Sequence, residues 1–244
     1  MYRLSMRHFL SVFLLLFALS VQAQVGSPRN EWAVGLNGGW TLSRVTFTPT
    51  VRQVQHQAPT FGITARFTSE KYFALLAAVQ MEVNYARLGW TEDIHSYIGN
   101  KLPDTYQRDI HYIQVPLLTS LALGKEQNGV KGFLLLGPQV GYAFADKEMR
   151  SEQWTTRTAQ QTTVPDRTND AYLQYGKSLD RRIDYGITAG LGLELGTGIG
   201  RFLLDARYYY GLADIFHNAK KDPFSRSAHA TIMAKLTYLI DLKR

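Results

Sequence analysis

Residues 183–195 show the pattern that recurs along most of this chain, in which apolar and polar positions alternate. The odd positions carry Ile, Tyr, Ile, Ala, Leu, Leu and Leu, whereas the even positions carry Asp, Gly, Thr, Gly, Gly and Glu. A repeat of two residues is typical of a β-strand, whose successive side chains point to opposite faces. The segment is therefore predicted to form a strand with one apolar face and one polar face.

Seven further segments show the same alternation, so the sequence predicts eight strands. By residue range, these are 31–43, 60–68, 73–88, 111–123, 133–145, 183–195, 201–212 and 229–242. The connections after the second, fourth and sixth strands are short, whereas the others are long and polar, the longest running from about Asp146 to Asp180. Short turns at one rim and long loops at the other are expected of an outer-membrane barrel with both termini in the periplasm.

The polar faces of these strands hold charged residues among glycines and other small residues. A soluble ligand-binding barrel would enclose its apolar faces instead, but eight strands leave an interior that side chains only just fill. Rows of Leu, Ile and Tyr would crowd it. We therefore predict an all-β, up-and-down antiparallel transmembrane barrel with apolar side chains toward lipid, a closed form that satisfies every backbone hydrogen-bonding group in hydrocarbon. The charged residues expected in its lumen are Arg66, Glu82, Asp184, Glu194, Asp205, Arg207 and Lys235.

Aromatic residues gather toward the two ends of the predicted lipid-facing rows. Aromatic side chains favour strands in general, but that bias does not explain why the strand centres use Leu, Val, Ile and Ala instead. Two interfacial girdles are typical of membrane barrels. At the long-loop ends we expect Trp40, Phe61, Tyr85, Tyr142, Phe144, Tyr185, Tyr208 and Tyr210. At the short-turn ends we expect Trp32, Phe67, Phe73, Phe202 and Tyr238.

The first residues have the features of a secretory signal peptide. Arg3, Arg7 and His8 precede an apolar run over residues 9–19, which a small-residue cleavage site ending at Ala23 follows. The run is too short to span a bilayer of roughly 30 Å comfortably as an anchor, and no later run of 18 apolar residues predicts a transmembrane helix. We therefore expect a cleaved signal peptide at 1–23 and one barrel domain at 24–244.

Composition points to a bacterial envelope protein. The chain has no cysteine, which argues against a small disulfide-stabilised secreted module. Cleavage after Ala23 would remove two basic residues and change the formal charge of +7 to +5. Because this positive excess is spread out, it favours contact with the anionic phosphates of lipid or lipopolysaccharide over nucleic-acid binding.

Several segments resemble a known family. They are "FTSEKYFALLAAVQMEVNYARLGW" (67–90), "RDIHYIQVPLL" (108–118) and "KGFLLLGPQVGY" (131–142). These segments resemble the PorT-like outer-membrane β-barrel family of the Bacteroidetes, over essentially the whole mature chain. The resemblance implies an integral outer-membrane barrel, and it suggests an association with type IX protein secretion because the founding member has one. The chain ends Ile240-Asp241-Leu242-Lys243-Arg244 rather than in the terminal aromatic residue of proteobacterial barrels.

The lumen charges allow two interpretations. Removed from bulk water, they must pair or draw in water, because an unpaired buried charge is costly. They form either a gated ion or proton path or a salt-bridged plug, and we favour the plug because barrels of this size are packed rather than open. Glu82, Arg207 and Lys235 are expected near mid-height, with Asp205 slightly lower.

No arrangement for catalysis, metal binding or cofactor binding is recognisable, so no residue is assigned to those roles. The histidines of the mature chain are His56, His95, His111, His217 and His229. They lie mostly in loops or at the rim, and no lipid-facing nucleophile, base and acid come together. His95 and His111 lack a nearby carboxylate cluster. The glycines of residues 186–200 lack the Gly-x-Gly-x-x-Gly spacing of a nucleotide site.

The long loops are the remaining candidates for function. The residues singled out there as possible contacts for a protein partner or lipopolysaccharide are Trp154, Tyr172, Tyr175, Lys220, Lys221 and Arg226. A solvated surface loop without a partner is the simpler alternative. The sequence thus predicts a monomeric, non-enzymatic outer-membrane scaffold or interaction protein, with a role in protein export as the first alternative and a narrow channel as the second.

Overall fold

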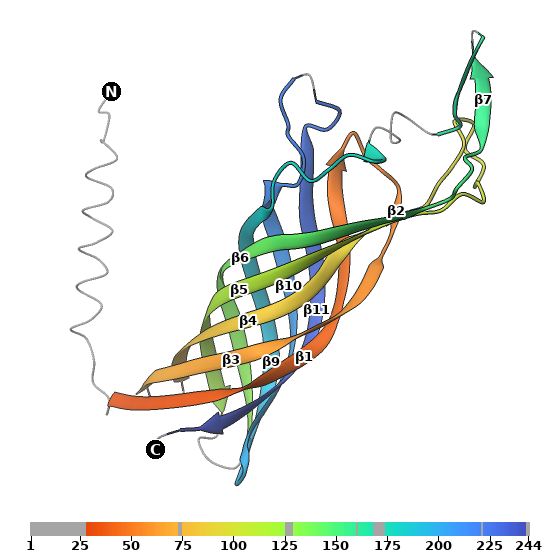
Figure 1. The fold of residues 1–244 in the computed structure, drawn as a ribbon. Coiled ribbons are helices and arrows are strands. Elements are labelled where there is room, and N and C mark those ends of the chain that lie inside the picture. The colour runs from red at the N-terminus through yellow and green to blue at the C-terminus, as the bar shows by residue number, and fades with distance from the viewer. Residues whose placement is uncertain are drawn as a thin grey trace, which may run out of the picture.

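The computed structural model describes residues 28–72, 75–124, 129–159, 161–167, 174–220 and 222–242. Eight long antiparallel strands form a closed barrel (Figure 1). These strands are β1 (Pro28–Thr48), β3 (His56–Tyr72), β4 (Leu75–Glu92), β5 (Tyr106–Gly124), β6 (Val130–Arg150), β9 (Ile183–Thr197), β10 (Gly200–Asp214) and β11 (Arg226–Asp241). Three short strands lie outside the ring: β2 (Gln53–Val54), β7 (Thr156–Ala159) and β8 (Thr162–Pro165).

The ring closes because the first strand pairs with the last. Each long strand pairs with the next long strand along the chain, and β6 pairs with β9 across the β7–β8 insertion. The pairing of β1 with β11 runs from Ala33 opposite Asp241 to Thr48 opposite Arg226. Figure 1 shows these two strands side by side, one from each end of the chain. The predicted up-and-down antiparallel barrel is confirmed.

The strands extend further toward the long-loop end than the alternation predicted. β5 begins at Tyr106 rather than at residue 111, and β6 continues to Arg150, so the predicted loop from Asp146 to Asp180 is shorter and contains the β7–β8 hairpin. In Figure 1, β4, β5 and β6 run past the ring toward this hairpin. Beyond the apolar belt no lipid imposes alternation, so the sequence pattern fades although the backbone ladder continues.

The two faces of each strand differ as the inverted barrel requires. Along β4, the outward Val79, Met81 and Val83 are exposed, whereas Gln80 and Glu82 between them are buried. Because the same alternation runs around the ring, the molecule presents an apolar outer belt. Within the described ranges, no helix is long and apolar enough to cross a bilayer. The predicted signal peptide at 1–23 and Phe73 lie outside the described residues.

The aromatic residues of the two predicted girdles lie on the outer face, and several make ring contacts with one another. At the short-turn end, Trp32 packs against Phe67 with ring centroids 4.9 Å apart, and Phe202 packs against Tyr238 at 4.8 Å. At the long-loop end, Phe61 contacts Tyr85 at 5.0 Å. The remaining girdle residues, Trp40, Tyr142, Phe144, Tyr185, Tyr208 and Tyr210, are all exposed.

The lumen is not wholly polar, which differs from the sequence expectation. Buried apolar residues form one cluster at each end. The mouth cluster, at the long-loop end, is Val45, Phe47, Val51, Ala86, Leu88, Trp90, Ile94, Tyr106, Ile110, Tyr112, Ala143, Ile215, Phe216 and Phe224. The base cluster, at the short-turn end, is Ala33, Leu76, Leu118, Ala122, Phe133, Leu135, Leu203 and Leu239. The charged residues therefore lie along a lumen that has apolar packing at both ends.

Candidate functional site

Glu82 is the centre of an ion-pair network at mid-height in the lumen. Its Oε1 lies 2.9 Å from Arg207 Nη1, and its Oε2 lies 2.6 Å from Lys235 Nζ. Arg207 also pairs with Asp205, Nε to Oδ2, at 2.5 Å. The register explains this meeting, because Asp205 lies directly opposite Lys235 on the neighbouring strand. Two carboxylates thus face two cations, which is the arrangement a salt-bridged plug needs.

Neutral side chains complete the coordination of Glu82. Gln80 Nε2 donates to Glu82 Oε1 at 2.6 Å, and Asn84 Nδ2 donates to Oε2 at 2.9 Å. Both amides lie on the same face of β4 as Glu82, two residues away in either direction. Each carboxylate oxygen therefore accepts from one cation and one amide, as a buried charge requires.

A second charge cluster lies nearer the short-turn end. Arg66 Nη1 is 2.7 Å from Glu194 Oε2, and Lys131 Nζ is 3.2 Å from Glu194 Oε1. Arg201 approaches the same oxygen at 3.9 Å and also pairs with Asp241. Arg66 Nη2 donates to Ser120 Oγ at 3.2 Å. Six of the seven charges predicted for one lumen network thus divide into two separate ion-pair clusters.

Asp184 belongs to neither cluster. It is buried in the lumen beside Gly141, at the long-loop end of β9. Among the described residues, none forms an ion pair with it within 4.0 Å. The nearby lumen is polar but largely uncharged, with Tyr112 Oη 3.0 Å from His229 Nε2 and Thr188 donating to Gln139 at 2.8 Å.

Arg108 links the mouth cluster to the loop that covers it. Its buried guanidinium lies 5.8 Å from the centroid of the Trp90 ring and 5.6 Å from that of Phe216. The same group forms ion pairs with Asp146 at 2.5 Å and Glu148 at 3.2 Å. Nη1 also donates to the carbonyl of Lys177 at 2.7 Å. This last bond holds residues 174–182, which we call the strap, against the barrel mouth.

Glu92 holds the first residues of the strap. It lies at the end of β4, beyond the girdle residue Tyr85 on the same strand and outside the apolar belt. Its carboxylate accepts hydrogen bonds from Gln174 and, at 2.5 Å, from Tyr175 Oη. Burial raises the pKa of Glu92 to about 7, and burial with the nearby Glu92 charge raises the pKa of Tyr175. The contact is therefore sensitive to pH near neutrality.

Beyond the strap, two loops join into an ordered projection that we call the arm, residues 93–105 and 151–167 except 160. Asp166 Oδ1 accepts from the backbone N–H of Tyr97 at 3.0 Å. Arg157 lies 4.4 Å from the centroid of the Tyr97 ring. Arg167 pairs with Asp104 at 2.9 Å. The arm exposes Tyr97 and Ile98 at the tip of the first loop.

The residues singled out in the loops have different surroundings. Trp154 and Tyr175 stack with centroids 4.8 Å apart and planes 7° apart, and Arg167 lies 4.7 Å from the Trp154 centroid. They are internal to the arm and strap rather than isolated side chains. Lys220 is exposed in the last loop, and Arg226 contacts Tyr210. Tyr172 and Lys221 lie outside the described residues.

Sequence reasoning missed several residues of these clusters. Lys131 and Arg201 of the second cluster lie at strand ends, where apolar side chains on both faces obscured the inward parity. Arg108, Glu92 and Glu148 lie in segments read as loops. Arg108 is an even number of residues from the inward Tyr112, and Glu92 is an even number from the inward Leu88. Extending the predicted strands by the same alternation would therefore have placed both side chains in the lumen.

Among the described residues, no group of three or more His, Asp or Glu side chains is placed to hold a metal ion. The histidines have different surroundings. His56 pairs with Asp109 at 3.3 Å, and His111 Nδ1 lies 2.7 Å from Tyr85 Oη in the girdle. His95 lies 2.9 Å from the Asp93 carbonyl, and His217 is exposed.

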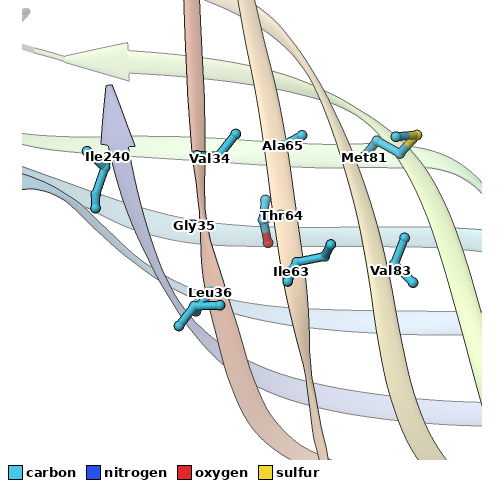
Figure 2. A pocket seen from close by; sticks show the side chains of 9 residues that line it. All are labelled: Val34, Gly35, Leu36, Ile63, Thr64, Ala65, Met81, Val83 and Ile240. Carbon is cyan, nitrogen blue, oxygen red and sulfur yellow. The ribbon is translucent and has the colours of Figure 1, made fainter. Parts of the chain in front are cut away.

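One hollow lies on the outer face, within the apolar belt (Figure 2). It has a volume of about 370 Å³. Its lining residues are Val34, Gly35, Leu36, Ile63, Thr64, Ala65, Met81, Val83 and Ile240. Apart from Thr64, the lining residues are apolar, which suits contact with lipid acyl chains.

A closed antiparallel ring with an apolar outer belt, aromatic girdles and a polar, ion-paired lumen defines a β-barrel membrane protein. The chain belongs to the outer membrane protein beta-barrel domain family, whose model matches residues 22–217. The bacterial outer membrane is therefore its location. No curated protein sequence matches the chain.

Solved outer-membrane barrels resemble the fold. The attachment invasion locus protein Ail of Yersinia pestis, solved with the heparin analogue sucrose octasulfate, is 14% identical with a TM-score of 0.36, covering 86% of this chain and 99% of Ail. OprG of Pseudomonas aeruginosa is 11% identical with a TM-score of 0.42, covering 88% and 98%. The N-terminal barrel of Pseudomonas aeruginosa OprF is 10% identical with a TM-score of 0.41, covering 88% and 100%.

Proposed function

We propose that this protein is a monomeric, non-enzymatic outer-membrane scaffold whose arm binds a protein partner outside the cell. The observation that carries the proposal is the contrast between the lumen of the barrel and the arm. The lumen is filled by reciprocal ion pairs and closed by the mouth cluster, whereas the arm is ordered by its own contacts and projects beyond the barrel. The proposal includes the orientation usual for outer-membrane barrels, in which both termini are periplasmic and the long loops face the exterior.

A narrow channel is the less favoured alternative. Conduction needs a continuous polar path, and the mouth cluster places Trp90, Tyr106 and Phe216 above the lumen charges. The charged side chains around Glu82 are also paired with one another, at distances of 2.5–2.9 Å. Single-channel recording of the purified protein tests this alternative, and large selective currents would support it against the scaffold.

A role in protein export is the other alternative, and the PorT-like segments of the sequence favour it. The test is genetic: deletion of the gene would lower the amount of exported cargo at the cell surface. If surface cargo is unchanged in the deletion strain, the export role is excluded while the scaffold proposal stands.

The arm is tested by pull-down from detergent-solubilised outer membranes. Removing all of residues 146–180 would also remove the end of β6 and the strap, so the variant should replace only residues 156–165 with a Gly-Ser linker. The matched control replaces residues 217–220, exposed in another loop of the same rim, with Gly-Ser. A partner bound by wild type and control but lost from the arm variant supports the proposal. The same bound proteins from all three would contradict it.

A further inference from the structure

The outer face of β1, β10 and β11 carries two arginines just beyond the aromatic girdle. Arg44 on β1 is exposed, and Arg226 at the start of β11 is half-buried. In the described part of the chain, neither side chain has a carboxylate within ion-pair distance. Asp214, opposite Ala228 on the neighbouring strand, accepts hydrogen bonds from the Ser227 backbone N–H at 2.6 Å and from Asn218 at 2.9 Å. Asp222, four residues before Arg226, accepts from the Ala219 backbone N–H at 2.9 Å.

The strand register brings these two arginines toward one spot. Ala230 on β11 lies directly opposite Arg44 on one side and Tyr210 on the other. Arg226 reaches Tyr210, where Nη2 donates to the hydroxyl at 2.8 Å and the guanidinium lies 5.4 Å from the ring centroid. Since adjacent strands are about 4.8 Å apart, the Cα atoms of Arg44 and Tyr210 are roughly 10 Å apart.

Small side chains form the floor between the arginines. Ala230 and Ala228 occupy the outward positions of β11 there, opposite Arg44 and Thr46 on β1. Ala228 and Ala230 are only 1% and 4% exposed, so longer neighbouring side chains cover this row. An anion here would be held at the surface by those longer side chains. Arginine is suited to that role because its planar fork donates two parallel hydrogen bonds to phosphate oxygens.

The height of this site is that of lipid headgroups. Trp40 on β1, below Arg44 on the same face, and Tyr208 and Tyr210 on β10 are exposed girdle residues. Aromatic girdles mark the membrane–water interface, so Arg44 and Arg226 lie at its outer edge. Elsewhere on this rim, by contrast, Arg87 is paired with Asp109 at 3.5 Å and Lys177 with Asp180 at 3.0 Å.

We propose that Arg44, Arg226 and Tyr210 form a binding site for the phosphate group of a membrane lipid headgroup. The proposal rests on the long-loop rim facing the outer leaflet, as in the proposed function, but not on any protein partner of the arm. Arg44 and Arg226 contact the phosphate oxygens from opposite sides, and the acyl chains lie against the apolar belt below. The phosphate can belong to a lipid A-type glycolipid or to a phospholipid.

The test is a binding titration of the purified full barrel in neutral detergent. The probes are diphosphoryl lipid A, enzymatically dephosphorylated lipid A and phosphatidylglycerol. Arg44→Gln and Arg226→Gln should each weaken lipid A binding roughly fivefold, and the double variant about 25-fold. The Arg44→Lys and Arg226→Lys double variant keeps both charges and should retain most of the affinity. Arg150→Gln, at an exposed arginine at the end of β6, is the matched control and should bind as wild type does.

Each outcome bears on the site. Loss of lipid A binding in the Gln variants, with weak binding of the dephosphorylated probe, supports a glycolipid phosphate. Equal loss for phosphatidylglycerol supports the same phosphate site with a phospholipid as its source. If the double variant binds like wild type, or if Arg150→Gln loses as much, the proposal is wrong. Should Arg226 variants fold poorly, Arg44→Gln keeps the test valid, because within the described part of the chain the Arg44 side chain makes no hydrogen bond or ion pair that the substitution would remove.

Discussion

The lumen plug makes a strong prediction for Glu82→Ala. The Glu82 carboxylate is fully buried and is the ion-pair partner of Lys235, which has no other acid within 4.0 Å among the described residues. Arg207 keeps Asp205 at 2.5 Å after the change. The substitution therefore leaves one uncompensated cation in the lumen, and breaking a buried ion pair in this way costs about 3–5 kcal/mol.

A second substitution tests where this cost arises. Glu82→Ala combined with Lys235→Met removes the orphaned cation as well, so we expect most of the loss to be recovered, leaving less than about 2 kcal/mol. Val83→Ala, one residue away on the lipid face, is the matched control. It should lower the free energy of unfolding by only about 1 kcal/mol, because lipid acyl chains fill the space left by the lost methyl groups and no cavity forms.

The assay is equilibrium unfolding by urea of the mature barrel refolded into phospholipid vesicles, with planar-bilayer conductance recorded in parallel. We expect Glu82→Ala to shift the unfolding midpoint strongly while conductance stays near that of wild type. An unchanged midpoint together with a new or larger selective current would refute the plug, because it would mean that Glu82 controls ion passage rather than stability.

Three further predictions follow from the same structure. Burial raises the pKa of Glu92 from 4.5 to about 7, so the folded state binds this proton more tightly than the unfolded chain does. The strap is therefore held most stably below pH 4.5, and this stabilisation of up to about 3 kcal/mol is lost as the pH rises through 7. Intrinsic-rate-corrected hydrogen exchange of residues 174–180 should be faster at pH 8 than at pH 5, and Glu92→Gln should remove the difference; equal protection at both pH values would contradict this. Met81→Arg on the lipid face should lower the free energy of unfolding by about 2–4 kcal/mol, whereas a cost near zero would argue against lipid contact there. Trp154→Ala should loosen the arm by about 1 kcal/mol through loss of its stacking on Tyr175, measured as faster exchange of residues 151–159 with the barrel strands unaffected.

The barrel itself could be predicted from the sequence because lipid imposes a strict rule on both faces. Every outward position in the belt must be apolar, and every strand of a closed ring follows the same two-residue repeat. Residues 183–195 show that repeat without interruption, and they form β9. The prediction of eight strands needed no knowledge of which residues touch.

The partners within the lumen could not be predicted in the same way. Alternation gives the face of Arg66 and of Glu194 but not their contact, because 128 residues separate them and β1, β11 and β10 lie between their strands on one side of the ring. The apolar end clusters were hidden for another reason. Phe133 and Leu135 face inward next to the outward Leu134 and Leu136, so apolar residues on both faces concealed the inward row.

The arm and strap were the least predictable part. Their contacts depend on where polar loops settle once the ladder has left the membrane, and no periodicity records that. Arg108 illustrates the difficulty, since its bond to the Lys177 carbonyl spans 69 residues of sequence. The sequence singled out Trp154 and Tyr175 as possible partner contacts without indicating that they stack on each other.

The central claim is that apolar side chains face lipid and charged side chains face a closed lumen. The chain contains no cysteine, so single cysteines at positions 79 to 84 of β4 can carry a spin label without background. Accessibility to lipid-soluble oxygen and to a water-soluble nickel chelate should then be measured in vesicles. We predict high oxygen accessibility at Val79, Met81 and Val83 and low accessibility to both reagents at Gln80, Glu82 and Asn84. High nickel accessibility at Val79, Met81 and Val83 would place those side chains in water and contradict the account.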